Sequence, residues 1–373
     1  MMKDNPLRTL GTLGQSIWLD YIRRDLIVSG ELRRLIEEDG LRGMTSNPSI
    51  FEKAIAGSHD YDDDIRGMVL AGKGVKEIYE SLSQRDVQSA ADAFRPLYDK
   101  TEGRDGYVSL EVNPHLAHDT RGTMEEARRL WVALNRPNVF IKVPATAEGL
   151  PVIQQLISEG INVNVTLLFG IPRYRQVVEA YLAGVEARAP QAKPVKAVAS
   201  VASFFVSRID TLVDRLLEER IAQGGKGADL AKLLHGQVAV ASAKAAYQIY
   251  KDIFGSARFE KLADKGARTQ RLLWASTGTK NPEYSDVKYI EALIGPDTVD
   301  TVPVETLDEY RDHGEPQDRI EQEVVKARWM LDRLPGLGIR IDTVTQQLED
   351  EGVDKFSKSF DKLMAALEKA VHK

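Results

Sequence analysis

The chain has 373 residues, 43% of them hydrophobic, and a formal net charge of −6 with acidic and basic residues mixed along its length. It can therefore bury a large core, as one barrel-sized domain or as two ordinary ones, and its charge argues against nucleic acid or an anionic membrane as the main partner. The absence of cysteine excludes disulfides, a thiolate nucleophile and cysteine-ligated metals. Residues 1–10 lack a signal-peptide core, and no run of about 18 apolar residues could span a bilayer, which favours a cytoplasmic location.

Short apolar runs with the composition of buried strands recur along the chain, separated by segments with helical periodicity. In chain order these runs are residues 16–20, 43–49, 107–113, 139–143, 161–169, 196–203, 271–277 and 298–304. Eight strands alternating with helices predict an α/β protein whose parallel β/α units close into a single (β/α)8 TIM barrel, with residues 1–373 as one domain. An open doubly wound sheet is the competing fold. The barrel is favoured because polar residues collect at the C-terminal halves of most strands, where barrel enzymes carry their chemistry.

The helical segments are predicted from capping residues and periodicity. Thr123-Met-Glu-Glu126 matches a capping box, residues 149–159 form a helix that ends at Gly160, and an alanine-rich helix runs from about residue 228 to 254. Additional helices, near residues 60–105, after the sixth strand and at the C-terminus, are expected outside the barrel. The last of them is amphipathic and could cover either the barrel or a partner subunit; its apolar face consists of Val353, Phe356, Phe360, Leu363, Met364 and Leu367.

Lys142 lies inside the apolar run Val139-Phe-Ile-Lys-Val143. A lysine in a buried strand is costly as a cation, because desolvation disfavours the charged amine. A neutral amine is also the group that attacks a carbonyl to form a Schiff base. A plain ion pair with Glu111, on a neighbouring strand, is the alternative interpretation.

In the barrel register, polar side chains from several strand ends converge on one mouth. Each has an ordinary explanation by itself: Asp20 could cap the next helix, Asn47 before Pro48 is a common turn residue, and Thr166 and Ser203 could be structural. The functional hypothesis depends on their lying together. The set is Asp20, Asn47, Glu111, Lys142, Asn164, Thr166 and Ser203.

Other motifs give weaker signals. The glycine-containing stretches at residues 72–74 and 224–227 lack the strand-before, helix-after context of a phosphate loop and are interpreted as helix breakers or surface loops. His115 and His118 follow Glu111 at a spacing that permits a metal site, but the sequence offers no obvious third histidine near another strand end. No metal is therefore predicted.

Five motifs, in this order, resemble the transaldolase family. They are Thr45-Ser-Asn-Pro-Ser-Ile-Phe51, Ser109-Leu-Glu-Val112, Ile141-Lys-Val-Pro-Ala-Thr146, Ile161-Asn-Val-Asn-Val-Thr-Leu-Leu-Phe169 and Trp274-Ala-Ser-Thr277. The resemblance extends over about residues 10–370. It implies a class I aldolase-type barrel that transfers a dihydroxyacetone unit from sedoheptulose 7-phosphate to glyceraldehyde 3-phosphate in the pentose phosphate pathway, without a cofactor.

The resemblance also implies roles for individual residues. Lys142 would be the Schiff-base lysine and Asp20 the acid/base group for cleavage and formation of the carbon–carbon bond. Glu111 and Thr166 would hold a water that relays protons. Three further residues would bind the sugar chain, namely Asn47, Asn164 and Ser203.

At the phosphate end, Arg208 matches the phosphate-binding arginine of the family and Ser276 matches a serine after the seventh strand. In familiar shorter members an arginine closely follows that serine. This chain instead has Lys280, which could act as a point charge or be a surface lysine. Two alternatives to a transaldolase remain, a fructose-6-phosphate aldolase-type enzyme and a non-catalytic sugar-phosphate-binding barrel. Sugar phosphates are the expected partners, and the protein is expected to be a monomer or a homodimer.

Overall fold

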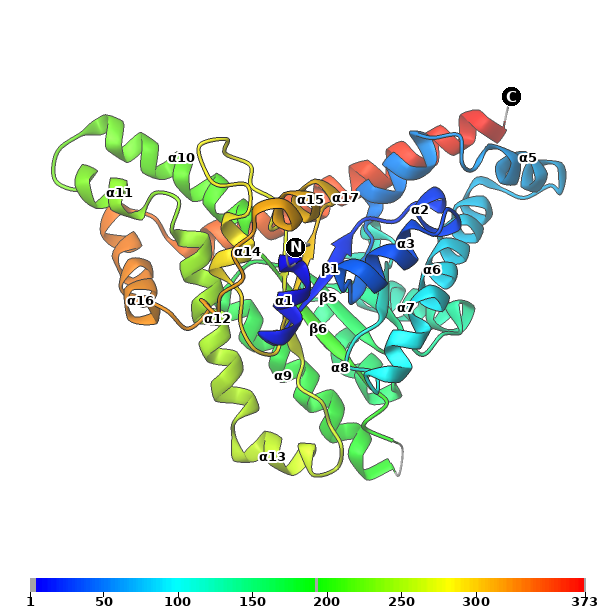
Figure 1. Cartoon of the computed structure of the whole chain (residues 1–373), viewed down its shortest axis with the longest axis horizontal. Coiled ribbons are helices and arrows are strands. Elements are labelled where there is room, and N and C mark those ends of the chain that lie inside the picture. The colour runs from blue at the N-terminus through cyan, green and yellow to red at the C-terminus, as the bar shows by residue number, and fades with distance from the viewer. Residues whose placement is uncertain (1–4, 192–193, 372–373) are drawn as a thin grey trace.

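Eight parallel strands form a closed barrel in sequence order, from β1 to β8 and back to β1 (Figure 1). This computed structural model describes residues 5–191 and 194–371, so the first four residues of the segment considered for a signal peptide lie outside it. The barrel confirms the predicted fold class and excludes the open sheet. The strands are β1 Gln15–Asp20, β2 Gly43–Thr45, β3 Tyr107–Glu111, β4 Val139–Pro144, β5 Val163–Leu168, β6 Ser200–Phe205, β7 Arg271–Ala275 and β8 Thr298–Val302.

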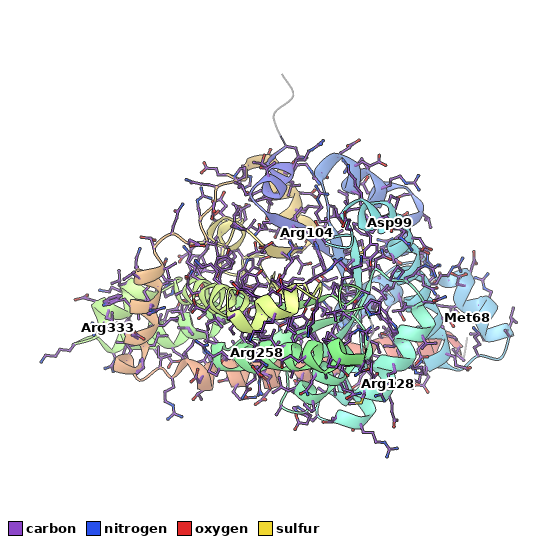
Figure 2. All side chains as sticks on the ribbon, turned by 90° about the horizontal axis from the view of Figure 1, so that it is seen from below. Met68, Asp99, Arg104, Arg128, Arg258 and Arg333 are labelled. Atoms are coloured by element: carbon purple, nitrogen blue, oxygen red, sulfur yellow. The ribbon has the colours of Figure 1, made fainter. Side chains whose placement is uncertain are left out.

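The helices surround the barrel and cover its ends. They are α1 Pro6–Thr12, α2 Arg24–Val28, α3 Glu31–Arg34, α4 Pro48–Phe51, α5 Asp62–Leu70, α6 Val75–Lys100, α7 Thr120–Leu134, α8 Gly149–Glu159, α9 Ile171–Arg188, α10 Ser207–Gln223, α11 Ala228–Leu234, α12 Val238–Phe254, α13 Ala257–Ala263, α14 Lys288–Ala292, α15 Val304–His313, α16 Val324–Arg333 and α17 Ile341–Val371. Ion pairs join neighbouring helices on the outside. Arg258 of α13, labelled in Figure 2, contacts Glu179 and Glu186 of α9 at 2.6 and 2.7 Å. Within residues 5–191 and 194–371, no helix has both the length and the apolar character to cross a membrane.

The inside of the barrel is layered, because alternate residues of a strand point to the same side. On β1, Ser16 lies at the N-terminal end, where it accepts a hydrogen bond of 2.7 Å from Arg271. Two residues further, Trp18 stacks on Phe140 with ring centroids 6.1 Å apart. The next inward residue, Asp20, lies at the C-terminal end. The polar residues at the N-terminal end and the aromatic layer therefore lie beneath the functional groups at the C-terminal end of the barrel.

Gly43 makes room for the aromatic layer. A Cβ at this position would lie 2.5 Å from the Trp18 indole, so only glycine permits this close approach of β2 to the ring. Trp18 is completely buried as a result.

Three details of the predicted elements are wrong. Helix α7 begins one turn before the predicted capping box, because Asp119 caps it by accepting from Gly122 N at 3.0 Å, whereas Thr123 donates to the Leu116 carbonyl. Strand β6 begins at Ser200 rather than at residue 196, since a turn in which Val198 N bonds to Val195 O precedes it.

The third correction concerns the predicted alanine-rich helix over residues 228–254, which is two helices, α11 and α12. Gly236 separates them with a left-handed φ of 70°, and its N–H donates to Asp214 Oδ1 at 2.7 Å. A composition rich in alanine predicted one helix, but this tertiary hydrogen bond stabilises a turn within it.

Helix α17 lies across the C-terminal mouth of the barrel rather than merely outside it (Figure 1). It contacts α4, α6 and α10, and Gly352 lets it approach the barrel so closely that a Cβ there would lie 2.9 Å from Leu167. Leu167 itself has a left-handed φ of 55°, next to a register irregularity between β5 and β6. The sequence left open whether the C-terminal helix covers the barrel or a partner subunit. In the structure, α17 covers the barrel.

Candidate active site

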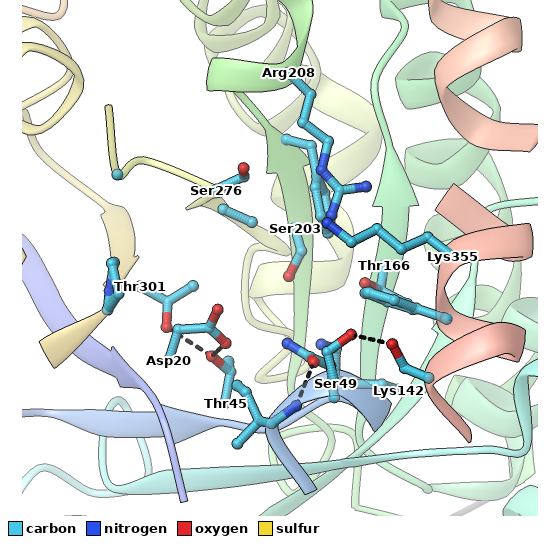
Figure 3. Close-up of a pocket in the computed structure, with 18 of the residues that line it drawn as sticks. Asp20, Thr45, Ser49, Lys142, Thr166, Ser203, Arg208, Ser276, Thr301 and Lys355 are labelled. Carbon is cyan, nitrogen blue, oxygen red and sulfur yellow. Dashed lines mark hydrogen bonds between the residues drawn. The ribbon is translucent and has the colours of Figure 1, made fainter. Parts of the chain in front are cut away.

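A cavity of about 400 Å³ opens at the C-terminal end of the barrel (Figure 3). Most of the residues predicted for the site line it, and they come from six strands or the loops that follow them. They are Asp20, Asn47, Lys142, Thr166, Ser203, Arg208, Ser276 and Lys280. Glu111 and Asn164 do not line the cavity but are buried directly beside these groups.

Lys142 projects from β4 into the floor of the cavity, with only 4% of its surface exposed. Its Nζ donates to the Ser46 carbonyl at 3.0 Å and lies 3.6 Å from Glu111 Oε2. The register between β3 and β4 pairs Glu111 with Lys142, which explains why the two side chains meet. The amine is thus fixed by the barrel while its tip faces the cavity.

Glu111 is a buried carboxylic acid with unsatisfied hydrogen-bonding capacity. Burial raises its pKa to about 7, although the charge of Lys142 opposes the rise. Both of its oxygens, and also Thr166 Oγ1, are buried without a hydrogen-bond partner among the described residues. Buried polar atoms are normally satisfied, so these three are suited to bind a small polar molecule beside Lys142. A carboxyl group whose pKa is near neutrality can both take up and release a proton there.

Asp20 is held by hydroxyl groups on the opposite side of the cavity floor. Thr45 donates a hydrogen bond of 2.7 Å to its Oδ1, and Thr45 Oγ1 also lies 2.7 Å from Thr301 Oγ1. Burial raises the pKa of Asp20, against the opposing effects of Lys142 and of the Thr45 hydrogen bond. The cap of the next helix, α2, is Arg23, so Asp20 is not the helix cap that its position allowed.

The two carboxyl groups therefore have different surroundings. Asp20 accepts a hydrogen bond and borders the cavity. Glu111 lies behind the lysine, 3.6 Å from its amine, and its oxygens have no hydrogen-bond partner among the described residues. Such differences allow two carboxyl groups in one site to perform different proton transfers.

A chain of hydrogen bonds orients the residues behind Lys142. Ser203 donates to Asn164 Oδ1 at 2.6 Å, and Asn164 Nδ2 donates to Ser109 Oγ at 3.1 Å. Asn47 fulfils the ordinary role considered for it, because its side chain caps α4 by accepting from Ile50 N at 3.1 Å. That bond uses Oδ1 and leaves the Asn47 amide nitrogen as the group available to a ligand.

The outer part of the cavity is cationic. Arg208 lies in the first turn of α10 and is over the Phe205 ring, 5.4 Å from its centroid; burial lowers its pKa. Ser276 follows β7 with a left-handed φ of 55°, and its Oγ lies 3.0 Å from Ser207 Oγ. Lys280 lines the cavity too, so this exposed side chain belongs to the same mouth.

Sequence reasoning missed several residues of this cavity. Thr45, which donates to Asp20, and Thr301, whose hydroxyl contacts that of Thr45, gave only the weak signal of hydroxyls at strand ends. Lys53 and Lys355 also line the mouth. Both are ordinary surface lysines by pattern, and the approach of α17 to the barrel was needed to bring Lys355 there.

The two histidines weighed as metal ligands lie outside this cavity. His115 is 2.7 Å from Asp361 and His118 is 3.1 Å from Glu148, in exposed pairs. In the described part of the chain, no three or more His, Asp or Glu residues are grouped so that they could hold a metal ion.

The chain that forms this barrel and its buried lysine site also matches a known protein family. A profile of the transaldolase/fructose-6-phosphate aldolase family matches residues 17–367. The chain belongs to this family. It is 49% identical to a transaldolase of Trichodesmium erythraeum, over all of this chain and 99% of that protein. It is 45% identical to a transaldolase of Saccharopolyspora erythraea (98% and 97% covered) and 46% identical to one of Thermobifida fusca (96% of each). The Lys142 strand thus lies within a family match that covers nearly the whole chain.

Proposed function

We propose that the chain is a transaldolase, which transfers a dihydroxyacetone unit from sedoheptulose 7-phosphate to glyceraldehyde 3-phosphate and yields erythrose 4-phosphate and fructose 6-phosphate. The observation that carries the proposal is the buried Lys142 amine at the cavity floor, 3.6 Å from Glu111 Oε2, in a cavity that Asp20 also lines. Family membership and relatives named transaldolase support the same reaction. Its place would be the pentose phosphate pathway, and its residues require no cofactor for this chemistry.

The first step would be imine formation. Neutral Lys142 Nζ attacks the C2 carbonyl of the donor, and the carbinolamine loses its hydroxyl as water to give an iminium ion. Glu111, with a pKa raised to about 7, would supply and remove protons through a water held by Thr166. The unsatisfied oxygens of Glu111 and Thr166 support this assignment.

Carbon–carbon cleavage would follow at the iminium. Asp20 takes the proton from the C4 hydroxyl, the C3–C4 electron pair moves toward the iminium, and the aldose leaves while an enamine stays on Lys142. Attack of the enamine on the aldehyde of the acceptor, with Asp20 returning the proton, forms the new bond, and hydrolysis of the imine releases the product. The raised pKa of Asp20 suits a group that both accepts and donates a proton.

The rest of the cavity would bind the substrate. Asn47 and Ser203 would orient sugar hydroxyls, and the buried Asn164 would act through Ser203, whose hydroxyl donates to it. Arg208, Ser276 and Lys280 would bind the phosphate at the cationic mouth. An arginine next to a helix N-terminus is a favourable anion site, because the N–H groups of the first turn add partial positive charge.

Reduction with borohydride in the presence of fructose 6-phosphate tests the covalent step. The expected product is a three-carbon adduct on Lys142, located by mass spectrometry after digestion. An adduct at another lysine, or turnover without any adduct, would contradict the role of Lys142. Absence of both turnover and adduct would instead favour a non-catalytic sugar-phosphate-binding barrel.

The second enzymatic candidate is a fructose-6-phosphate aldolase, which the family name includes. It would release dihydroxyacetone from fructose 6-phosphate without an acceptor. The assay compares fructose 6-phosphate turnover with and without erythrose 4-phosphate, and we expect turnover only when the acceptor is present. Undiminished activity in excess chelator is the expected result that separates both candidates from a metal-dependent aldolase.

A further inference from the structure

Helix α17 contributes a lysine to the mouth of the cavity. Lys355 lines the cavity together with Phe356 and Ser359 of the same helix. In Figure 3 its side chain extends from α17 toward the guanidinium group of Arg208. Lys53, after α4, and Lys280, after β7, line the same cavity. We call Lys53, Arg208, Lys280 and Lys355 the cation cluster.

Three acidic groups lie in the surroundings of the cation cluster: Glu52 lines the same cavity, and the charges of Asp20 and Glu351 oppose the lowering of the pKa of Arg208. Within residues 5–191 and 194–371, none of its four members forms an ion pair, whereas Lys358, one turn along the same helix from Lys355, pairs with Asp354. Arg208 is the main cause of a lowered pKa at Lys355, and Lys280 and Lys53 act in the same direction. Unpaired like charges repel one another, so a bound dianion would relieve a repulsion that the folded protein otherwise carries.

Packing fixes the part of α17 that carries Lys355. Phe356 is buried, and Ser359 Oγ lies 2.8 Å from Ser49 Oγ of α4. Three residues before Lys355, Gly352 approaches Leu167 of the barrel. The helix is therefore held at the mouth on both sides of Lys355, and only the flexible lysine side chain has to adjust to a ligand.

We infer that Lys355 binds the phosphate group of the sugar substrates, so that the C-terminal helix selects phosphorylated over unphosphorylated ketoses. The inference rests on the proposed function for the identity of the substrate. A phosphate monoester carries a charge of about −1.5 to −2 near neutral pH, and its oxygens accept from several donors. Arg208 would bind it through two parallel hydrogen bonds, and Lys355 would approach it from α17 as a point charge.

The test compares Lys355→Met with Lys362→Met, a change of an exposed lysine further along α17 that does not line the cavity. We expect Lys355→Met to raise the KM for fructose 6-phosphate about tenfold with less than a threefold change in kcat. It should leave kcat/KM for unphosphorylated fructose unchanged, and Lys355→Arg should restore most of the affinity. Lys362→Met should match the wild type in every assay.

A second measurement keeps the inference separate from the proposed function. Calorimetric titration with inorganic phosphate should give a dissociation constant that is several-fold weaker for Lys355→Met than for Lys362→Met, whether or not the wild type turns over any sugar. Equal phosphate affinity and equal KM in the two variants would overturn the inference and leave the Lys142 chemistry intact. If Lys355→Met does not fold, Lys355→Gln and Lys355→Arg provide the same neutral-versus-charged comparison.

Discussion

Replacing Glu111 with glutamine tests both the electrostatics and the chemistry of the site. The substitution keeps the shape of the side chain and removes its ability to ionise. In the folded protein, burial raises the pKa of Glu111 from 4.5 to about 7. The folded state consequently holds this proton more tightly than the unfolded chain does. The contribution of protonated Glu111 to the free energy of unfolding is therefore largest at low pH.

The size of the effect follows from that rise. About 1.36 kcal/mol corresponds to each unit of difference between the folded and unfolded pKa, which gives roughly 3 kcal/mol as an upper value for Glu111. Because the folded pKa is the higher one, this contribution is fully present below pH 4.5 and is lost as the pH rises through about 7. The glutamine side chain does not ionise, so Glu111→Gln keeps this contribution at every pH. The free energy of unfolding of the variant should therefore rise relative to that of the wild type by up to about 3 kcal/mol between pH 5 and pH 8.

The assay has two arms. Urea unfolding at a series of pH values between 5 and 8 compares the wild type, Glu111→Gln and, as a control, Glu125→Gln, which changes an exposed residue of α7. Steady-state transfer kinetics should show kcat lower by about 10²- to 10⁴-fold in Glu111→Gln, the usual range for losing a general acid–base group. The limb of the wild-type pH profile near pH 7 should also disappear.

Two results would refute this reasoning. A constant difference in unfolding free energy between the wild type and Glu111→Gln from pH 5 to pH 8 would show that Glu111 does not titrate with a raised pKa. A variant that retains wild-type kcat and the same pH profile would show that another group relays protons during imine formation.

Three further predictions follow from the site and its support. Lys142→Arg should fold and bind fructose 6-phosphate but give no turnover and, by mass spectrometry, no borohydride adduct, because a guanidinium does not form the imine. An adduct on another lysine would show that Lys142 is not the nucleophile. Thr45→Val removes the 2.7 Å hydrogen bond to Asp20, so the pKa of Asp20 should rise further and kcat should fall about tenfold. The corresponding limb of the pH–rate profile should move to higher pH, and an unchanged profile would contradict this prediction. Burial raises the pKa of Asp300 from 3.8 to about 8, so at about 1.36 kcal/mol per unit Asp300→Asn should be more stable than the wild type by up to about 6 kcal/mol in urea unfolding at pH 9, with little difference at pH 4. A destabilised variant at pH 9 would exclude a raised pKa there.

The pattern of the sequence predicted the barrel because the relevant signals are local. Apolar runs such as residues 139–143 and helical segments such as residues 149–159 depend on neighbouring residues and on stops such as Gly160. Local pattern failed where a distant group decided the structure. The break at Gly236, for example, depends on a hydrogen bond from its N–H to Asp214, far away in the sequence.

The candidate site divides in the same way. Lys142 was conspicuous because a charge in an apolar strand is costly, and the strand ends supplied Asp20, Glu111 and Thr166 as neighbours once the barrel was assumed. The structure brings these groups together at one end of the barrel.

The sequence by itself determined the parallel β/α architecture and the position of Lys142 within a strand, because periodicity and desolvation act on adjacent residues. Only the tertiary structure decided which distance separates Lys142 from Glu111, which hydroxyls hold Asp20, and what lies over the mouth. Lys355 is the clearest case: its helical pattern is that of a solvated surface, and the packing of Gly352 against Leu167 places it beside the cavity. Contacts between residues that are far apart in the chain set the charge and the shape of that site.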